Sequence, residues 1–395
     1  GLEKRPKLRF PGFDDPWKET TLSALFSKST QKNADGHITN VICNSAKLGL
    51  IPQREYFDKD IANSDNTSGY YIIRQNDFVY NPRKSSDAPY GPISSYKYAE
   101  DGIVSPLYLC FHAKGEINPL YYEWYFRSSA WHRYIYMSGD SGARHDRVSI
   151  KDDTFFAMPI NLPSEQEQSK IASFLQSLDE RIAAQEKLVA SLKKYKRGVN
   201  NQILSQFDNS YNCRLGSVCE IVGGGTPDTL HAEYWGNTVE WFTPSEIGKT
   251  KYVNNSVRKL SDIGLDNSSA KLLPIGTVLL TTRATLGEMS IAKRECSTNQ
   301  GFQSLIPHTD RVSSEYLYYM QIIIKPWCEK YASGNTFREI SKSALSDCII
   351  PIPDRARQEQ IVKLLSSIDM IIDAAESISM SLSKIRHGLM QQLFI

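Results

Sequence analysis

Few segments of this 395-residue sequence carry the residue types that catalysis needs, and each lacks part of its pattern. Asn118-Pro-Leu-Tyr121 comes close to the Asn/Asp-Pro-Pro-aromatic motif that holds a flipped base in enzymes that methylate adenine at N6. Leu120 stands where the second proline belongs, and no glycine-rich cofactor loop precedes the segment. We interpret it as a loop that leads into the aromatic stretch 121–126.

Two further segments could bind phosphate or a metal ion, and both are incomplete. Gly223-Gly-Gly225 has no Lys-Ser/Thr pair after it to complete a P-loop, which favours a flexible turn. Pro227-Asp228 is followed by Glu246-Ile-Gly-Lys249, one residue longer than the Glu-x-Lys spacing with which a metal-dependent nuclease surrounds its ion. The seven histidines have no spacing typical of a zinc enzyme. The sequence therefore predicts neither a catalytic site nor a metal site.

Several loops instead combine arginine or lysine with short polar side chains, the set that contacts phosphates and base edges in DNA. For any single arginine, a solvated charge or a structural ion pair is the alternative, whereas the loops as groups favour DNA. The candidate DNA-binding residues are Arg83, Lys84, Arg144, His145, Arg147, Arg283, Thr285, Asn335 and Arg338.

A repeat with an offset of 190 residues organises the elements that must position these loops. Residues 163–204 align without a gap on residues 353–394, with identical pairs such as Asp179 and Asp369. Each copy begins at a proline and continues without another for about forty residues, or roughly 60 Å of helix. The repeat predicts two long helices.

Apolar residues recur every seven positions in both copies, a spacing typical of a coiled coil. The predicted helix–helix seam consists of Ile171, Leu178, Leu192, Val199, Ile361, Ile368, Leu382 and Leu389. Its companion positions are Phe174, Leu188, Tyr195, Leu364, Ile371, Ile378 and Ile385. Because the two helices share a register and nearly a length, we expect them to pack antiparallel. The alternative is two unrelated amphipathic helices, each packed on its own domain.

The segments before and between the helices are rich in short alternating apolar runs, with frequent Gly, Pro, Asn and Asp breaks. Each ends in a proline-bounded apolar strand, predicted at 155–163 and at 349–353. The predicted fold is α+β: two strand-rich globular domains alternate with two long helices that pair as an antiparallel coiled coil. The boundaries are 1–162 for the first domain, 163–207 for the central helix, 208–352 for the second domain and 353–395 for the C-terminal helix.

Composition agrees with two ordinary globular domains, with 41% hydrophobic and 23% charged residues. A net charge of +2 excludes a polybasic tail protein but leaves local DNA-binding patches open. No apolar run reaches the roughly 20 residues that span a bilayer, and residues 1–10 lack the apolar core of a signal peptide. The seven cysteines are scattered without a CxxC pair, which favours free thiols in a cytoplasmic protein.

A last set of segments runs through nearly the whole chain. They are Lys7–Phe13 before Trp17, Gly223–Pro227, Tyr234-Trp235, Trp241–Pro244, Thr281–Gly287, Asn299–Phe302, Ala332–Lys342, and the helix entries at Pro163 and Pro353. With these segments the chain resembles the specificity subunits of type I restriction-modification systems, most strongly in the second domain and both helices.

The resemblance implies that each globular domain is a target-recognition domain, which reads one half of an asymmetric, interrupted sequence in double-stranded DNA. The paired helices would set the spacing between the halves and dock two methyltransferase subunits, to which restriction subunits with translocase and nuclease activity can add. The chain itself would be no enzyme and would bind no cofactor, because S-adenosylmethionine would be held by the methyltransferase. The alternative is a non-enzymatic two-domain scaffold that binds protein or RNA.

Overall fold

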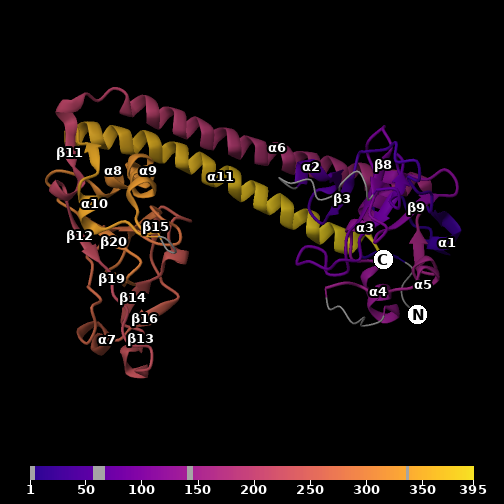
Figure 1. The fold of residues 1–395 in the computed structure, drawn as a ribbon, viewed down its shortest axis with the longest axis horizontal. Coiled ribbons are helices and arrows are strands. Elements are labelled where there is room, and N and C mark those ends of the chain that lie inside the picture. The colour runs from indigo at the N-terminus through magenta and orange to yellow at the C-terminus, as the bar shows by residue number, and fades with distance from the viewer. Residues whose placement is uncertain (1–4, 57–66, 140–145, 335–337) are drawn as a thin grey trace. The chain divides into compact units, whose positions relative to one another are not determined.

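The computed structural model of the chain describes residues 5–56, 67–139, 146–334 and 338–395. The chain forms two compact units, each with its own hydrophobic core (Figure 1). Unit 1 contains residues 1–186 together with 377–395, and unit 2 contains residues 187–376. Both units mix short strands with helices, so the predicted α+β class is confirmed.

Unit 1 contains a four-stranded sheet of order β2-β9-β6-β7 and three strand pairs, β1-β10, β3-β4 and β5-β8. Its strands are β1 (Lys18–Thr21), β2 (Phe26–Lys28), β3 (Ile42–Ser45), β4 (Gly49–Pro52), β5 (Tyr71–Ile73), β6 (Phe78–Tyr80), β7 (Ile93–Ser95), β8 (Gly102–Val104), β9 (Leu109–Ala113) and β10 (Pro159–Leu162). Its short helices are α1 (Leu22–Leu25), α2 (Gln53–Tyr56), α3 (Pro119–Arg127), α4 (His132–Ser138) and α5 (Asp152–Phe156).

The core of unit 1 is dominated by aromatic rings. Phe78 and Phe111, on the adjacent strands β6 and β9, stack with ring centroids 5.6 Å apart, and Phe26 meets Phe111 edge-on. The chain end joins this core, because Phe394 packs against Tyr121 and its neighbours on α3. Large rings bury much apolar area with few rotamers, which suits a core assembled from very short strands.

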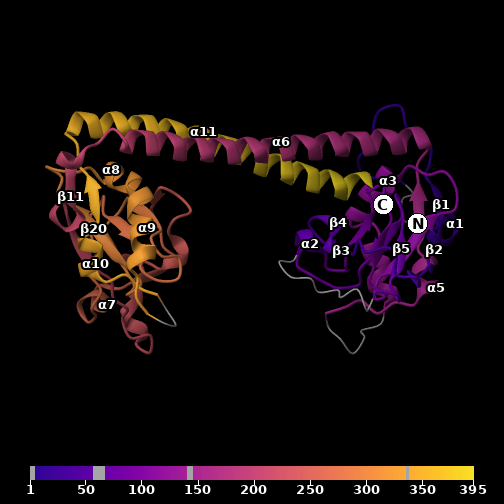
Figure 2. The same ribbon diagram turned by 45° about the horizontal axis from the view of Figure 1, so that its top comes forward.

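Unit 2 contains a five-stranded sheet of order β12-β20-β17-β18-β15, a four-stranded sheet of order β13-β16-β14-β19 and the pair β11-β21. Its strands are β11 (Asn212–Arg214), β12 (Cys219–Gly223), β13 (Trp235–Gly236), β14 (Val239–Phe242), β15 (Tyr252–Val253), β16 (Arg258–Leu260), β17 (Val278–Leu280), β18 (Met289–Ala292), β19 (Cys296–Thr298), β20 (Gln303–Pro307) and β21 (Ile349–Pro351). Its short helices are η2 (Asn209–Tyr211), η3 (Leu215–Ser217), η4 (Ala232–Tyr234), η5 (Pro244–Glu246), α7 (Asp262–Asp266), α8 (Ser314–Tyr319), α9 (Gln321–Tyr331) and α10 (Lys342–Ser346). Helix α8 contacts β17, β18 and β20 of the larger sheet (Figure 2).

Both globular regions open and close with the same device. In unit 1, β1 pairs antiparallel with β10, and in unit 2, β11 pairs antiparallel with β21. The predicted closing strand at 155–163 is therefore wrong in its first residues, because Phe155 and Phe156 belong to α5. Asp152 and Asp153 lie in the first turn of that helix, where negative charge is favourable.

The two long helices are confirmed as α6 (Glu165–Leu204, 40 residues) and α11 (Arg355–Leu393, 39 residues). Their starts are built alike: the buried side chain of Gln168 donates to the carbonyl of Pro163 at 3.1 Å, and that of Gln358 donates to the carbonyl of Pro353 at 2.9 Å. As a division into recognition domains and spacers, the predicted boundaries stay a prediction. Each long helix begins in one compact unit and ends in the other.

The buried face of these helices differs in part from the predicted seam. Ile171, Ile361 and Ile368 are buried, and the other predicted seam residues are half-buried. The companion positions are wrong, because Phe174, Leu188, Tyr195, Leu364, Ile371, Ile378 and Ile385 are all exposed. The buried companions are one residue further on, at Leu175, Ile182, Ile203, Leu365, Ile372 and Leu393. Apolar residues occupy both flanks of the stripe, so its period alone could not distinguish the two flanks.

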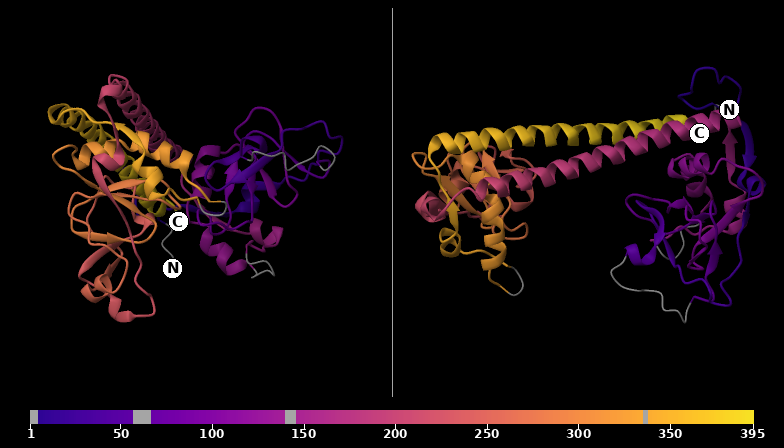
Figure 3. Two further views of the ribbon diagram at one scale, coloured as in Figure 1. Left: turned by 60° about the vertical axis from the view of Figure 1, so that its left-hand side comes forward. Right: turned by 90° about the horizontal axis from the view of Figure 1, so that it is seen from above.

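Part of the buried face packs into the globular cores. Ile171 and Leu175 join the core of unit 1, and Leu365 and Ile368 join the core of unit 2. In unit 2, the last part of α6 and the first part of α11 lie together over the domain (Figure 3, right). The alternative in which each helix packs on a domain is thus realised to this extent.

Candidate nucleic-acid interface

In unit 1, the two predicted DNA-binding loops meet in one short ribbon. Arg83 and Arg147 face each other across an isolated antiparallel bridge. The amide of Lys84 donates to the carbonyl of Asp146 at 2.8 Å, and the amide of Val148 donates to the carbonyl of Pro82 at 2.9 Å. Segments more than sixty residues apart in sequence therefore present their arginines together. Arg144 and His145 lie outside the described residues.

The charges of this ribbon are loosely held. The nearest contact between Arg83 and Asp146 is 3.9 Å, and 68% of the Arg83 side chain is exposed. An ion pair of this kind contributes about 0–1 kcal/mol, so Arg83 is free to exchange Asp146 for a phosphate. The Nε of Arg147 is buried and has no hydrogen-bond partner within the described part of the chain.

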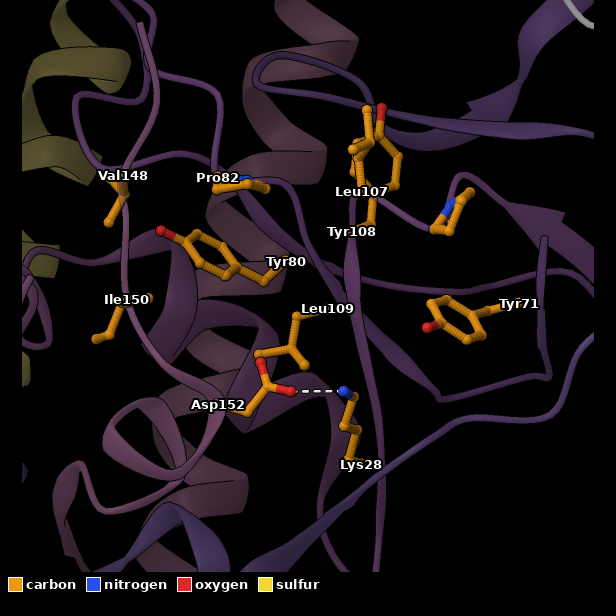
Figure 4. A pocket seen from close by; sticks show the side chains of 11 residues that line it. Lys28, Tyr71, Tyr80, Pro82, Leu107, Tyr108, Leu109, Val148, Ile150 and Asp152 are labelled. Carbon is orange, nitrogen blue, oxygen red and sulfur yellow. Dashed lines mark hydrogen bonds and ion pairs between the residues drawn. The ribbon is translucent and has the colours of Figure 1, made fainter. Parts of the chain in front are cut away.

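A pocket of about 180 Å³ lies beside the ribbon, with Pro82 and Val148 in its wall (Figure 4). Its lining is mostly aromatic and aliphatic, and an ion pair of 2.5 Å joins Lys28 to Asp152 at its edge. The hydrogen bond from Lys28 to Asp152 raises the pKa of the lysine, and burial raises the pKa of Tyr80. Both side chains therefore keep their neutral-pH charge states, lysine cationic and tyrosine neutral.

In unit 2, Arg283 and Thr285 lie on a tight loop between β17 and β18. The Thr281 hydroxyl donates to the carbonyl of Thr285, and the Gly287 amide returns to the carbonyl of Thr281 at 2.8 Å. Ala284 has a φ of 55°, a left-handed conformation that costs a non-glycine residue of order 1 kcal/mol. Gly287, with a φ of 77°, lies so close to Lys325 that a β-carbon would clash with it.

The second predicted loop of unit 2 contacts this one through a residue that the sequence reasoning missed. Glu339 forms an ion pair of 2.9 Å with Arg283 and accepts a hydrogen bond of 3.4 Å from the Thr282 hydroxyl. Arg338 points a different way, because its Nη2 donates to the carbonyl of Glu329 near the end of α9. Asn335 lies outside the described residues. The only sequence signal for Glu339 was its place beside Arg338 in the quoted motif.

The glycine segment 223–225 is packed tightly, so its interpretation as a flexible turn is wrong. A β-carbon on Gly224 would lie 1.9 Å from the carbonyl oxygen of Asn299. The Gly225 amide donates to the carbonyl of Thr298 at 2.9 Å, and its own carbonyl accepts from the Trp241 ring nitrogen at 3.0 Å. These glycines are needed because two backbone segments approach each other closely.

The segments that came near catalytic motifs have structural roles. Asn118 is the N-cap of α3, with its side chain accepting from the Tyr121 amide at 3.1 Å, and Tyr121 is fully buried. Glu246 closes a capping box with Thr243 and also accepts from the Val257 amide at 2.8 Å. Among the residues that the structure describes, no group of three or more His, Cys, Asp and Glu side chains could hold a metal ion. The seven cysteines are free thiols, as predicted.

No helix in the described part of the chain is both long enough and apolar enough to cross a membrane.

Comparison with known proteins gives the same family for both globular regions. Residues 24–194 and 207–382 each match the type I restriction modification DNA specificity domain. The MjaIX specificity subunit of Methanocaldococcus jannaschii is 34% identical over 186 residues, 46% of this chain and 43% of that protein. The EcoR124I/EcoR124II specificity subunit of Escherichia coli is 25% identical over 58% of this chain and 60% of that protein. The matches thus span about half the length of these relatives.

Solved structures show the same fold at low sequence identity. The HsdS subunit from Thermoanaerobacter tengcongensis is 19% identical with a TM-score of 0.52, over 100% of this chain and 99% of that chain. A chain from a type I restriction-modification system studied for complex assembly and conformational transition is 20% identical, with a TM-score of 0.65 over 98% of this chain and 99% of that chain. With both of its globular regions matched, this chain belongs to the family of type I restriction-modification DNA specificity proteins.

Proposed function

We propose that the chain is the non-catalytic specificity subunit of a type I restriction-modification complex, and that each globular region reads one half of an asymmetric, interrupted DNA site. The observation that carries this proposal is the contrast between the two arginine sites. One family domain occurs twice, yet unit 1 offers the ribbon of Arg83 and Arg147, whereas unit 2 offers Arg283 on a tight loop. Dissimilar sites in repeated domains suit two different half-sites and do not suit a palindrome.

We further propose that α6 and α11 pair as an antiparallel coiled coil that sets the spacing of the half-sites. Two cross-helix ion pairs support this. In unit 1, Asp179 binds Arg386, and in unit 2, Asp369 binds Lys196. Offsets of 190 residues relate Asp179 to Asp369 and Lys196 to Arg386, so the repeat exchanges one pair for the other. Such reciprocity is the mark of an isologous, two-fold contact.

The direction of pairing follows from a third contact. Lys193 forms an ion pair of 2.6 Å with Glu376, three residues before Lys196 and seven after Asp369. Partner numbers fall along α11 as they rise along α6, which is antiparallel order. Lys196 and Arg386 stand in the half-buried stripe of each helix, where a polar residue selects one register at some cost in stability.

The partners that we propose are two methyltransferase subunits, which would hold S-adenosylmethionine, together with restriction subunits. The exposed apolar side chains on the helices support a docking role. Leu188, Tyr195, Leu364 and Ile371 are each 47–61% exposed. Soluble proteins rarely leave such rows of apolar side chains uncovered. The free thiols favour action in the cytoplasm, where cysteines stay reduced.

The experiment uses the complex of this chain with its methyltransferase subunits. Genome-wide methylation mapping by single-molecule sequencing should yield one asymmetric motif with an unread gap. Binding to a duplex carrying that motif should exceed binding to random duplex by a factor of roughly 10³ or more at physiological salt. Binding that prefers single-stranded RNA, or that persists unchanged as salt rises, would favour a protein- or RNA-binding scaffold and overturn the proposal.

A further inference from the structure

Glu339 joins the two loops of unit 2 that carry the predicted DNA-binding residues. Its carboxylate forms the 2.9 Å ion pair through Nε of Arg283, and its other oxygen accepts the hydrogen bond from Thr282. The backbone of Glu339 is fixed as well, because its amide and carbonyl exchange bonds of 2.9 and 3.0 Å with Ser333. The carboxylate is therefore a fixed anchor for the arginine.

The anchor leaves the outer edge of Arg283 available. The contact with Glu339 is made through Nε, and neither terminal amino group donates a hydrogen bond within the described part of the chain. The Arg283 side chain is 44% exposed, more than that of Glu339 at 35%. A guanidinium held at Nε presents its two terminal amino groups side by side, in a fixed plane.

We propose that Arg283, held by Glu339, reads a guanine in the half-site of the second globular region. Two parallel N–H donors match the O6 and N7 acceptors that guanine alone presents in the major groove. Glu339 is then a positioning residue that determines specificity without touching DNA. This inference rests on the proposed function of the chain as a DNA-reading subunit.

The charge of Glu339 favours a base over a phosphate as the target of Arg283. A carboxylate beside the arginine repels the phosphate backbone and lowers the net charge of the pair to zero, which suits selective contact better than general attraction. The rigid loop has the same effect. The left-handed Ala284 and the hydrogen bond from Thr281 to Thr285 fix the backbone on both sides of Arg283, so little side-chain or loop ordering remains for binding.

The neighbouring Arg338 makes a useful contrast within the same surface. Its Nη2 donates to the carbonyl of Glu329, so one terminal amino group is already occupied by the end of α9. It cannot present both donors to one base without leaving that contact. Arg283 is therefore the residue of this pair that is built for bidentate recognition.

The test measures binding of the methyltransferase complex to its mapped site with single guanines replaced by 7-deazaguanine, which lacks the N7 acceptor. With the natural chain, one replacement in the half-site of unit 2 should weaken binding roughly 5- to 150-fold. Arg283→Ala should bind the natural site as weakly and show no further loss on replacement. Glu339→Gln, which keeps size and removes the charge, should reduce the ratio between the two DNAs while thermal unfolding stays unchanged.

Three controls keep the outcome clear. Glu295→Gln makes the same charge change at an exposed position of unit 2 and should leave the ratio as it is. Replacement in the unread gap should have no effect, and Arg338→Ala should keep the sensitivity to 7-deazaguanine. Equal sensitivity in Arg283→Ala and the natural chain, or a unit 2 half-site without any G·C pair, would overturn the inference alone. Absence of any specific duplex binding would overturn the proposed function with it.

Discussion

Two carboxylates 190 residues apart show what the chain has kept and what it has changed. Asp179 in unit 1 and Asp369 in unit 2 occupy the same place in the repeat, and each binds the basic residue at the equivalent place of the other helix. The globular residue that reaches the same carboxylate differs. In unit 1 it is Arg127, at 3.7 Å, and in unit 2 it is the hydroxyl of Tyr319, at 2.7 Å.

The same contrast continues outward to the DNA-binding candidates. Arg283 in unit 2 is held at 2.9 Å on a strained loop, whereas Arg83 in unit 1 is 68% exposed and has its nearest carboxylate at 3.9 Å. Helix–helix contacts are thus duplicated, domain–helix contacts are similar in place but not in chemistry, and the exposed loops share nothing in detail. Divergence grows with distance from the helices, as expected if the helices keep one task and the loops read different sequences.

The largest expected effect tests the duplicated part. Ile368→Asp places a charge at a position that is 5% exposed within the core of unit 2 and should lower the free energy of unfolding by about 3–5 kcal/mol. Leu178→Asp, at a half-buried position, should cost less. Ile371→Asp is the matched control, because this side chain is 55% exposed. Thermal unfolding measures all three, and equal midpoints for Ile368→Asp and Ile371→Asp would break the account of the buried face.

The next effect concerns the two arginines of unit 2. Arg283→Ala should weaken binding of the complex to its site by about 1–3 kcal/mol, the range for a lost bidentate base contact. Arg338→Ala should cost clearly less, because its guanidinium is engaged with the carbonyl of Glu329. Fluorescence anisotropy at fixed salt gives both values. A larger loss from Arg338→Ala would reverse the roles that the structure gives them.

A smaller effect tests the reciprocal ion pairs. Asp369→Lys should destabilise the chain by about 1 kcal/mol, since it faces Lys196 with a like charge at a partly exposed site. The double variant Asp369→Lys with Lys196→Asp should restore part of the loss, as a double-mutant cycle measures. Asp179→Lys with Arg386→Asp should behave in the same way in unit 1. Recovery in one unit alone would show that the repeat does not preserve this contact.

The smallest expected effect is a pH dependence confined to unit 1. Burial lowers the pKa of His132, whose ring lies 4.8 Å from that of Tyr90. Because the unfolded chain binds this proton more readily, the stability of unit 1 should fall as pH drops below about 6.5, toward the lowered pKa of the folded state. His132→Gln should flatten that part of the stability curve, measured by denaturant unfolding between pH 7.5 and pH 5.5. An unchanged slope would assign the acid sensitivity to other groups.

Sequence reasoning reached the elements and missed some of the contacts between them. The long helices and many of the strands follow from local signals, such as the prolines before α6 and α11 and the alternating runs at β5 and β6. The seam companions failed because the stripe is apolar on both flanks, and burial against a globular core decides between them. Residues 155–156 look like part of a strand but follow two aspartates that favour a helix start.

The candidate site divides in the same way. Residue types alone predicted that Arg83, Arg147 and Arg283 occupy loops, and the structure adds that the first two face each other. Glu339 could not be found by searching for basic residues, since its importance lies in a contact between segments more than fifty residues apart. Long-range pairings of this kind depend on the tertiary fold.

One measurement addresses modular reading most directly. The methylated motif of the complex is mapped by single-molecule sequencing for the natural chain, for Arg283→Ala and for Arg83→Ala combined with Arg147→Ala. We predict that Arg283→Ala relaxes only one half of the motif, that the double variant relaxes only the other half, and that the gap length stays the same in all three. If either variant altered both halves, or changed the gap, the two globular regions would not read DNA independently and the account would be contradicted.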